Sequence, residues 1–205
     1  YPNFGNKLYF SRIVENVSHF GQCYQDNDPT AEDLFSLGPS DGGVINIPEA
    51  GLIIKLHSMQ GALLVFASNG VWSITGSLAV GFAASDYTVS KLSAVASVSA
   101  TSFVDILGFP AWWNDEGIYI IRTDQSGGLT VDTLTDLTIK SYYDTVPSLA
   151  KKQARGYYNL VTKKVQWLFS TTDPTSTTDA YEFDRILTFD VRTGGLYPWT
   201  IGEPS

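Results

Sequence analysis

The chain has 205 residues, of which 43% are apolar and 17% charged, so it can bury a core and is not disordered along its length. Its net charge of −8 at pH 7 repels phosphate groups, which excludes tight general binding to nucleic acid and disfavours anionic membranes. A single cysteine, Cys23, excludes a disulfide within the chain and a zinc cluster of thiolates, and it fits folding in a reducing cytoplasm.

Targeting and membrane segments are not visible in the sequence. No basic segment precedes an apolar stretch, and no apolar run reaches the roughly 18–20 residues that span a bilayer. We therefore expect no secretory signal and no membrane anchor. The ends, YPNF and GEPS, lack the character of natural termini, so we expect the chain to be a fragment of a longer protein.

The first half of the chain contains predicted strands and one helical turn. Aromatic residues make up 13% of the chain, which favours strands. The first predicted strand covers residues 7–13, and residues 53–59 are also strand-like. Thr30 is a suitable cap for a short helical turn over residues 29–35. Residues 79–100, rich in Ala, Ser and Val, are consistent with a strand and an inserted loop.

The clearest element is a β-hairpin over residues 61–76. Two apolar runs flank Ser68-Asn69-Gly70, and Asn-Gly is expected to supply the positive φ angles of a tight turn. In the second arm, Trp72 and Ile74 alternate with smaller residues, so they are expected to face one side and pack there.

Three further hairpins are predicted at residues 109–121, 156–169 and 185–200. The first three hairpins recur about 45–50 residues apart, a spacing typical of four-stranded propeller blades. The last two lie closer together and are expected to form one four-stranded sheet. Between the hairpins, residues 134–143 have partly helical spacing, a pattern that Thr138 and Ile139 weaken. Residues 173–179 are expected to form a polar, exposed loop.

These elements predict an all-β fold of antiparallel, four-stranded β-propeller blades, forming a single propeller-like region over residues 1–205. It would be a partial propeller or a fragment of a larger one. The alternative is a β-sandwich, whose strands also recur with turns between them.

Candidate catalytic and metal-binding residues have simpler structural explanations. His19 and His57 have no Gly-x-Ser-x-Gly elbow to accompany them, and strand-like surroundings favour surface or hydrogen-bonded histidines. Asp26-Asn27-Asp28 begins like a calcium loop, but the sixth and twelfth positions are Ala31 and Leu37. The pairs Glu32-Asp33 and Asp115-Glu116 are most simply solvated turn residues. We therefore predict no catalytic, metal or cofactor-binding residue, no cofactor and no enzymatic activity.

Other polar and aromatic clusters also favour structural roles. The Gly pairs of residues 41–43 and 126–128 lack the helix and lysine of a phosphate loop, so they are expected to be turns. The basic cluster of residues 151–155 precedes a strand. It is expected to lie at a solvated strand edge, where its charges prevent pairing with another strand. In Trp112-Trp113 and Tyr157-Tyr158, one ring of each pair is expected in the core. The other is expected to be buried between blades, in preference to a sugar-stacking surface or the outside.

The order of these motifs resembles the nozzle proteins of podovirus tails, the tail tubular protein B family. The matching segments are KLYFS at residues 7–11, an acidic loop and Phe at 28–35, LLVFASNGVWSITG at 63–76, GFPAWWNDEGIYII at 108–121, YNLVTKKVQWLF at 158–169, and RILTFDVRTGGLYPW at 185–199. The resemblance covers residues 7–199. Residues 94–98 depart from the family pattern, which often carries a Gly-containing segment there.

The resemblance implies a structural role in the virion. Nozzle proteins are propeller-based subunits that form a hexameric ring below the portal and the tail adaptor protein. The ring continues the DNA channel and offers sites for tail fibre proteins, and the family has no catalytic residues to transfer. DNA would pass the acidic lumen without specific binding. The alternative is a glycan-binding or glycan-degrading β-propeller protein of the virion.

Overall fold

The computed structural model describes residues 5–14, 16–19, 38–77, 81–171 and 182–201. In this part of the chain the structure is mostly β, and every strand pairing is antiparallel, which confirms the predicted all-β fold with four-stranded sheets. The chain divides into two compact units, residues 1–94 (unit 1) and residues 95–205 (unit 2), which are described separately. None of the helices in the described part is long and apolar enough to cross a membrane.

Unit 1 contains a two-stranded and a four-stranded sheet. The two-stranded sheet pairs β1 (Lys7–Phe10) with β2 (Gly43–Asn46). The four-stranded sheet has its strands side by side in chain order: β3 (Ile53–Met59), β4 (Ala62–Ala67), β5 (Gly70–Gly76) and β6 (Tyr87–Ser93). Two short 3-10 helices, η1 (Val17–His19) and η2 (Pro48–Ala50), complete its regular structure.

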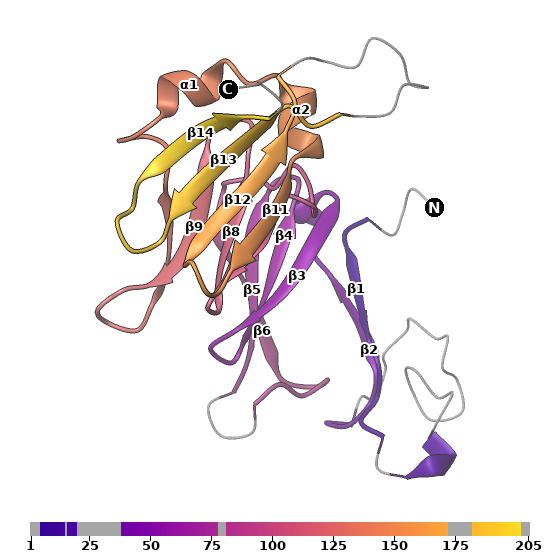
Figure 1. Cartoon of the computed structure of the whole chain (residues 1–205). Helices are drawn as coiled ribbons and strands as arrows, with labels where there is room; N and C mark the ends of the chain where they lie inside the picture. The colour runs from indigo at the N-terminus through magenta and orange to yellow at the C-terminus, as the bar shows by residue number, and fades with distance from the viewer. Residues whose placement is uncertain (1–4, 15, 20–37, 78–80, 172–181, 202–205) are drawn as a thin grey trace. The chain divides into compact units, whose positions relative to one another are not determined.

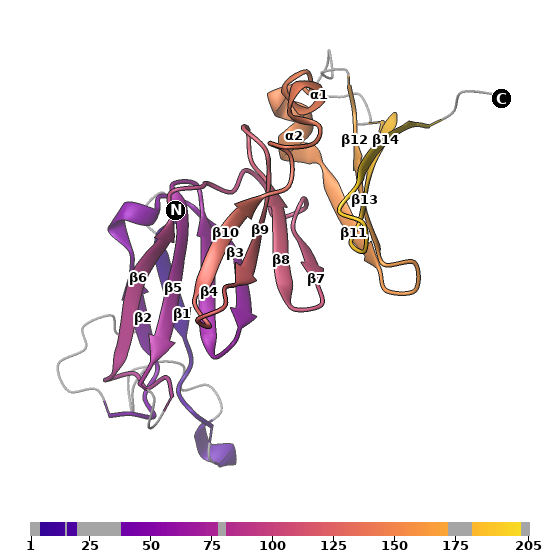
Figure 2. The ribbon, with the colours of Figure 1, turned by 90° about the vertical axis from the view of Figure 1, so that its left-hand side faces the viewer.

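Unit 2 contains two four-stranded sheets, again with strands in chain order (Figures 1 and 2). The first consists of β7 (Val104–Ile106), β8 (Phe109–Trp113), β9 (Ile118–Thr123) and β10 (Leu129–Thr133). The second consists of β11 (Arg155–Asn159), β12 (Lys164–Phe169), β13 (Arg185–Asp190) and β14 (Leu196–Thr200). The helices α1 (Lys140–Asp144) and α2 (Ser148–Gln153) connect the sheets and lie together at one end of them (Figure 2).

The predicted hairpins occupy two different positions within these sheets. Residues 61–76 and 109–121 form the second and third strands of their sheets, whereas residues 156–169 form the first and second strands of theirs. The expectation that residues 156–169 and 185–200 share one sheet is confirmed by the pairing of β12 with β13. The predicted polar loop at 173–179 lies outside the described residues.

The turn at residues 68–70 differs from the sequence prediction. Ala67 pairs with Gly70, so Ser68 and Asn69 form the turn, and only Gly70 has a positive φ, at 138°. Ser68 Oγ accepts a hydrogen bond from Leu52 N–H at 2.9 Å, and Asn69 Nδ2 donates to the Glu49 carbonyl at 2.8 Å. These side chains select the turn by binding the backbone around η2, a contact that the hairpin pattern does not reveal.

The tight turns with two positive φ angles occur elsewhere. Gln60-Gly61 and Leu107-Gly108 each connect the first two strands of their sheets, and all four residues have φ between 51° and 91°. This combination is typical of type I′ hairpin turns, in which glycine is favoured. The recurrence of this turn in the sheets β3–β6 and β7–β10 supports a shared structural unit.

Several predicted elements have different limits in the structure. β1 ends at Phe10 rather than residue 13, and within residues 79–100 only β6 is a strand of the described part. α1 begins at Lys140, after Thr138, whose hydroxyl donates to the Leu134 carbonyl at 2.7 Å. The predicted helical turn over residues 29–35 lies outside the described residues.

Each unit has its own apolar core. In unit 1, Trp72 and Ile74 are buried with Val65, Ile45 and Ile47, which confirms that Trp72 and Ile74 pack on one face. In unit 2, the facing sides of the two sheets enclose a cluster of large rings. The ring centroid of Trp113 lies 5.2 Å from that of Tyr143, 5.4 Å from Phe169 and 6.1 Å from Trp167. All four rings are almost completely buried, so this cluster contributes most to sheet packing.

Gly156 allows the two sheets of unit 2 to approach closely. Its N–H donates to the Thr101 carbonyl at 2.9 Å, just before β7. A Cβ at this position would overlap Val104 Cγ2 and lie 2.6 Å from Trp167 Nε1. The contact therefore requires a residue without a side chain, and a larger one must push strand β11 away from β7.

Gly156→Ala is expected to lower the free energy of unfolding by about 1–3 kcal/mol, because the new methyl overpacks the inter-sheet core. Denaturant unfolding followed by tryptophan fluorescence measures the change. Gly5→Ala is the control, since the tightest contact of its Cβ would be Leu52 Cδ1, at 3.3 Å, on an exposed side chain, and its backbone contacts would lie at 3.7 Å or more. Equal stabilities of the Gly156→Ala variant and the wild type would contradict this packing.

The β9–β10 turn contains a carboxylate that accepts several hydrogen bonds. Asp124 Oδ1 accepts from the Ser126 hydroxyl at 2.7 Å and from the backbone N–H groups of Ser126 and Gly128, each at 2.8 Å. The pKa of Asp124 is lowered mainly by the hydrogen bond from the Ser126 hydroxyl, and the hydrogen bond from Gly128 N–H lowers it further. This arrangement confirms that residues 126–128 belong to a turn.

Asp124→Asn is therefore expected to destabilise the protein at pH 7 and to have a smaller effect below pH 4. A carboxyl with a lowered pKa stabilises the fold above its unfolded-state pKa of about 3.9, and this contribution is lost as pH falls through the folded-state pKa. Thermal unfolding of both proteins between pH 2.5 and 7 measures the difference. A difference that stays constant across this range would refute the role of the carboxylate charge.

Candidate functional site

The two histidines lie in different elements of the described structure. His57 lies in the middle of β3 and is half-buried, which agrees with the prediction of a strand histidine. His19 ends η1 rather than lying in a strand, so its predicted strand setting is wrong. Among the residues that the structure describes, no group of three or more His, Cys, Asp or Glu side chains could hold a metal ion. Cys23, Asp26–Asp28 and Glu32-Asp33 lie outside them.

The Asp115-Glu116 pair lies in the β8–β9 turn, as predicted, with both side chains exposed. Asp115 Oδ1 accepts a hydrogen bond from the Ser148 hydroxyl at 2.7 Å, and Glu116 N–H donates to Asn114 Oδ1 at 2.8 Å. The bond from Ser148 attaches the turn to the start of α2. These contacts hold the turn in place and do not bring the two carboxylates together across a substrate.

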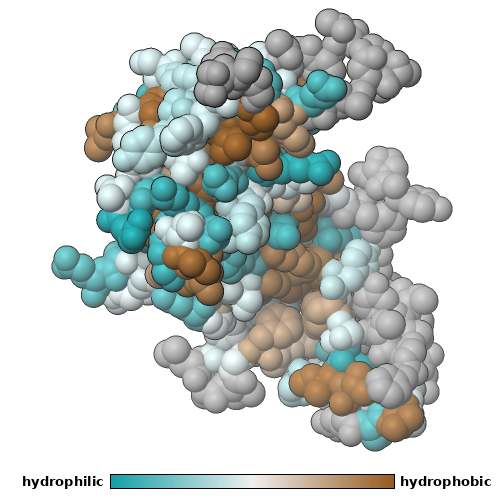
Figure 3. Space-filling model, in the orientation of Figure 1, coloured by the Kyte–Doolittle hydropathy of each residue, from teal (hydrophilic) through white to brown (hydrophobic). Residues whose placement is uncertain are grey.

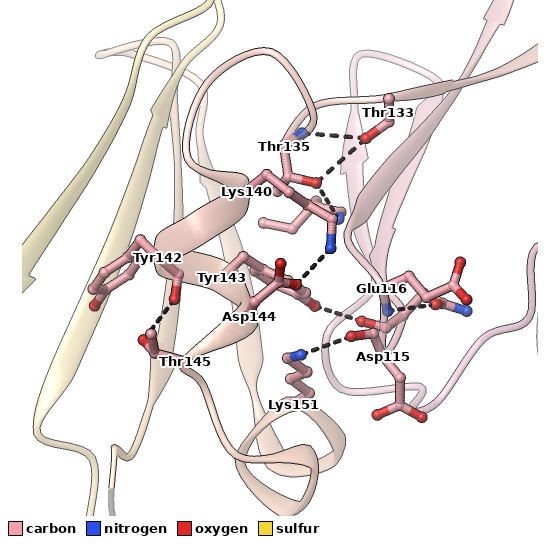
Figure 4. A network of polar contacts seen from close by, with 12 residues as sticks. Asp115, Glu116, Thr133, Thr135, Lys140, Tyr142, Tyr143, Asp144, Thr145 and Lys151 are labelled. Atoms are coloured by element: carbon pink, nitrogen blue, oxygen red, sulfur yellow. Dashed lines mark hydrogen bonds and ion pairs between the residues drawn. The ribbon is translucent and has the colours of Figure 1, made fainter.

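The basic cluster of residues 151–155 was predicted to be a solvated strand edge, and for Lys151 this prediction is wrong. Lys151 lies on α2 and is only 6% exposed. Its Nζ donates to the Asp115 carbonyl at 2.6 Å and lies 4.5 Å from the centre of the Tyr143 ring (Figure 4). The sequence does not indicate this because residues 148–153 form a helix that turns Lys151 inward and leaves Lys152 exposed.

The buried environment shifts the pKa of Lys151 and that of its neighbour Tyr143. The pKa of Lys151 is lowered mainly by burial, and the negative charge of Asp115 partly opposes this lowering. Burial also raises the pKa of Tyr143, whose hydroxyl donates to the Asn114 carbonyl at 2.6 Å. A buried lysine and tyrosine that both bind backbone carbonyls are expected to fix the turn against the helix rather than to transfer protons.

In each aromatic pair one ring belongs to the inter-sheet core or packs against it and the other lies on the opposite face of its sheet, as predicted. Trp112 and Trp113 are both fully buried. Trp113 belongs to the inter-sheet core, and Trp112 Nε1 donates to the Ala96 carbonyl at 3.1 Å from the opposite face of the sheet. In the second pair, Tyr158 packs against the inter-sheet core whereas Tyr157 is 63% exposed. The expected burial between blades is therefore not found for Tyr157 in the described chain.

The exposed side of the sheet β11–β14 is rich in aromatic residues. We call this side the outer face; by strand register its rows are Tyr157–Gln166–Thr188–Tyr197 and Arg155–Leu168–Ile186–Trp199. Tyr157, Tyr197 and Trp199 are 63%, 49% and 60% exposed. Figures 1 and 3 look directly onto this face, where apolar and weakly polar surface is mixed with polar groups. Exposed Trp, Tyr and Arg on one face are typical of a binding surface.

Unit 1 has a second exposed apolar feature, a hollow of about 360 Å³. Apart from Ser58, its lining residues are apolar or glycine: Leu8, Phe10, Ile45, Gly61, Ala62, Leu63, Ile74 and Phe82. Phe82 is partly exposed at the hollow, with its ring edge-on to Phe10 at 5.2 Å and stacked on Tyr87 at 5.6 Å. Figure 3 shows apolar surface on the side of unit 1 where β1 and β3 lie. The hollow therefore suits an apolar or aromatic group rather than a charged ligand.

Lys151→Met is expected to lower the free energy of unfolding by about 1 kcal/mol, because the Asp115 carbonyl loses its donor while the apolar stem is retained. Lys152→Met is the matched control, since Lys152 is the exposed neighbour on the same helix and its loss should change stability by less than about 0.5 kcal/mol. Chemical denaturation of the three proteins in parallel gives both values. Equal effects of the two substitutions would contradict a specific role for Lys151.

Comparison with models of protein families and with curated proteins finds no match to this chain. The resemblance of the motifs to tail nozzle proteins stays a prediction from the sequence. The candidate sites are therefore defined by geometry alone. They are the outer face of β11–β14 with its exposed aromatic rings and the apolar hollow of unit 1.

Proposed function

We propose that this chain is a structural, non-enzymatic part of a short-tailed bacteriophage tail nozzle. In this proposal it folds in the host cytoplasm and resides in the virion, in a ring of identical subunits, with six copies as the family resemblance implies. The ring forms part of the channel for DNA ejection, contacts the tail adaptor and provides a platform for tail fibres.

One observation carries this proposal: the order of the motifs coincides with the order of the sheets. The segments at 63–76, 108–121 and 158–169 fall on three successive four-stranded antiparallel sheets, and the segment at 185–199 completes the last of them. Sheets with strands side by side in chain order are the repeating unit of β-propellers. The resembling segments thus supply the two middle strands of the first two sheets and contribute to all four strands of the third.

The physical properties of the chain support a passive channel component. Tight turns join the strands within its sheets, and the two sheets of unit 2 pack on a large aromatic core, which favours a rigid subunit. The net charge of −8 disfavours adhesion to the phosphate backbone, so DNA is expected to slide past without being trapped.

A second candidate function, glycan binding, is favoured by the outer face. Tyr157, Tyr197 and Trp199 expose their rings on one side of a sheet, with Gln166 between the two tyrosines in the same row. Aromatic faces with polar neighbours can stack on sugar rings. Leu168 and Ile186 occupy the row that leads to Trp199, and such aliphatic residues favour a protein partner over a hydrophilic sugar.

Antibodies raised against this chain are expected to label the tails of virions of the phage that encodes it, as seen by immunogold electron microscopy. The purified chain is expected to bind no saccharide on a glycan array, because its exposed rings serve a protein contact. Virions without label would contradict the structural role. Saccharide binding that is lost in Trp199→Ser would favour the second candidate.

A further inference from the structure

The turn between β4 and β5 contains the only Asn-Gly pair of the sequence, Asn69-Gly70. The backbone nitrogen of a glycine in this position can attack the amide carbon of the preceding asparagine side chain. Any other residue hinders the attack with its own side chain, whereas glycine leaves the nitrogen accessible and the backbone free to rotate. The turn therefore carries the reactive groups of a spontaneous chemical modification.

The fold depends on both residues of this pair. The contact of Asn69 Nδ2 with the Glu49 carbonyl, at 2.8 Å, requires a hydrogen-bond donor on the side chain. Gly70 has a φ of 138°, and a Cβ at this position would lie 2.4 Å from the carbonyl oxygen of Ser93 on the neighbouring strand β6. The residue that makes the asparagine reactive therefore cannot be replaced without a change in the sheet.

The folded hairpin holds both reactive groups in other contacts. Gly70 is buried and pairs with Ala67 in the sheet, and the Asn69 amide is bound to the Glu49 carbonyl. The Asn69 N–H also donates to the Ala50 carbonyl at 3.1 Å. Attack by the glycine nitrogen requires the Asn69 side chain to rotate toward it, so these contacts have to open first. Local opening of the hairpin is therefore expected to limit the reaction.

We propose that Asn69 is a deamidation site of this chain, which the folded hairpin protects until the turn opens. In the first step a bond forms between Gly70 N and Asn69 Cγ, and the bond from Cγ to Nδ2 breaks. The departing nitrogen takes up the proton of the Gly70 N–H and leaves as ammonia. Water then opens the resulting cyclic imide at either of its carbonyl groups. The products are aspartate and isoaspartate, in which the main chain continues through the former side chain.

Both products disturb the turn, and isoaspartate disturbs it more. A carboxylate at this position cannot donate to the Glu49 carbonyl, and its negative charge repels that oxygen. Isoaspartate also adds a carbon atom to the main chain between the paired residues Ala67 and Gly70, which a tight two-residue turn cannot accommodate. Modified chains are therefore expected to pair β4 with β5 incompletely, and refolding does not reverse the change.

Incubation of the purified chain at mildly alkaline pH, folded and in urea, tests this proposal. Peptide mapping by mass spectrometry measures conversion at each asparagine. In urea, conversion at Asn69 should be at least about tenfold faster than in the folded chain, because the folded turn must first open. Asn69→Gln is the control, since its longer side chain closes the imide ring far more slowly and should abolish conversion in both states. Equal rates in both states, or conversion in urea no faster than at the other asparagines, would overturn the proposal.

Ser68→Ala tests whether the contacts of the turn provide the protection. It removes the hydroxyl that accepts a hydrogen bond from Leu52 N–H at 2.9 Å, and it leaves Asn69 and Gly70 unchanged. The folded variant, checked by circular dichroism, should deamidate about twofold to tenfold faster than the wild type, because one hydrogen bond that closes the turn is lost. In urea the two chains should react at the same rate. An unchanged rate in the folded variant would contradict protection by these contacts.

Discussion

The packing of two aromatic sheet faces against each other is the interaction on which unit 2 depends. Trp113 from one sheet meets Trp167 and Phe169 from the other, and Tyr143 from α1 closes one side of the cluster. Gly156 permits this approach by omitting a side chain where β11 passes Val104. The buried Lys151 then ties α2 to the turn at Asp115, so the helices are fixed by the same core. We expect the removal of any of these contacts to change the distance between the two sheets of unit 2.

The same constraint explains where functional surface is found. A four-stranded sheet with apolar residues on both faces needs a cover on each side, and β11–β14 has only one in the described chain. We therefore interpret the exposed rings of Tyr157 and Trp199 as part of a binding interface rather than as ordinary solvent-exposed side chains.

Much of the fold could be predicted because strand and turn chemistry is local. Alternation around Trp72 and Ile74 predicted their shared burial, and the two final hairpins were expected to share one sheet. The backbone conformation of the turn at Asn69 and the position of Lys151 could not be predicted, because distant backbone groups at Glu49 and Asp115 select them. The outer face and the hollow depend on register and on residues from separate strands. No local sequence pattern predicts the outer face or the hollow.

Native-state hydrogen exchange tests most directly whether the aromatic inter-sheet core holds unit 2 together. If it does, the slowest amides of β8 and β9 and those of β12 and β13 exchange through one common opening, with equal free energies and equal denaturant dependence. The account would be contradicted if one of the two sheets opened at a free energy several kcal/mol lower while the other stayed protected, since each sheet would then be stable without the other.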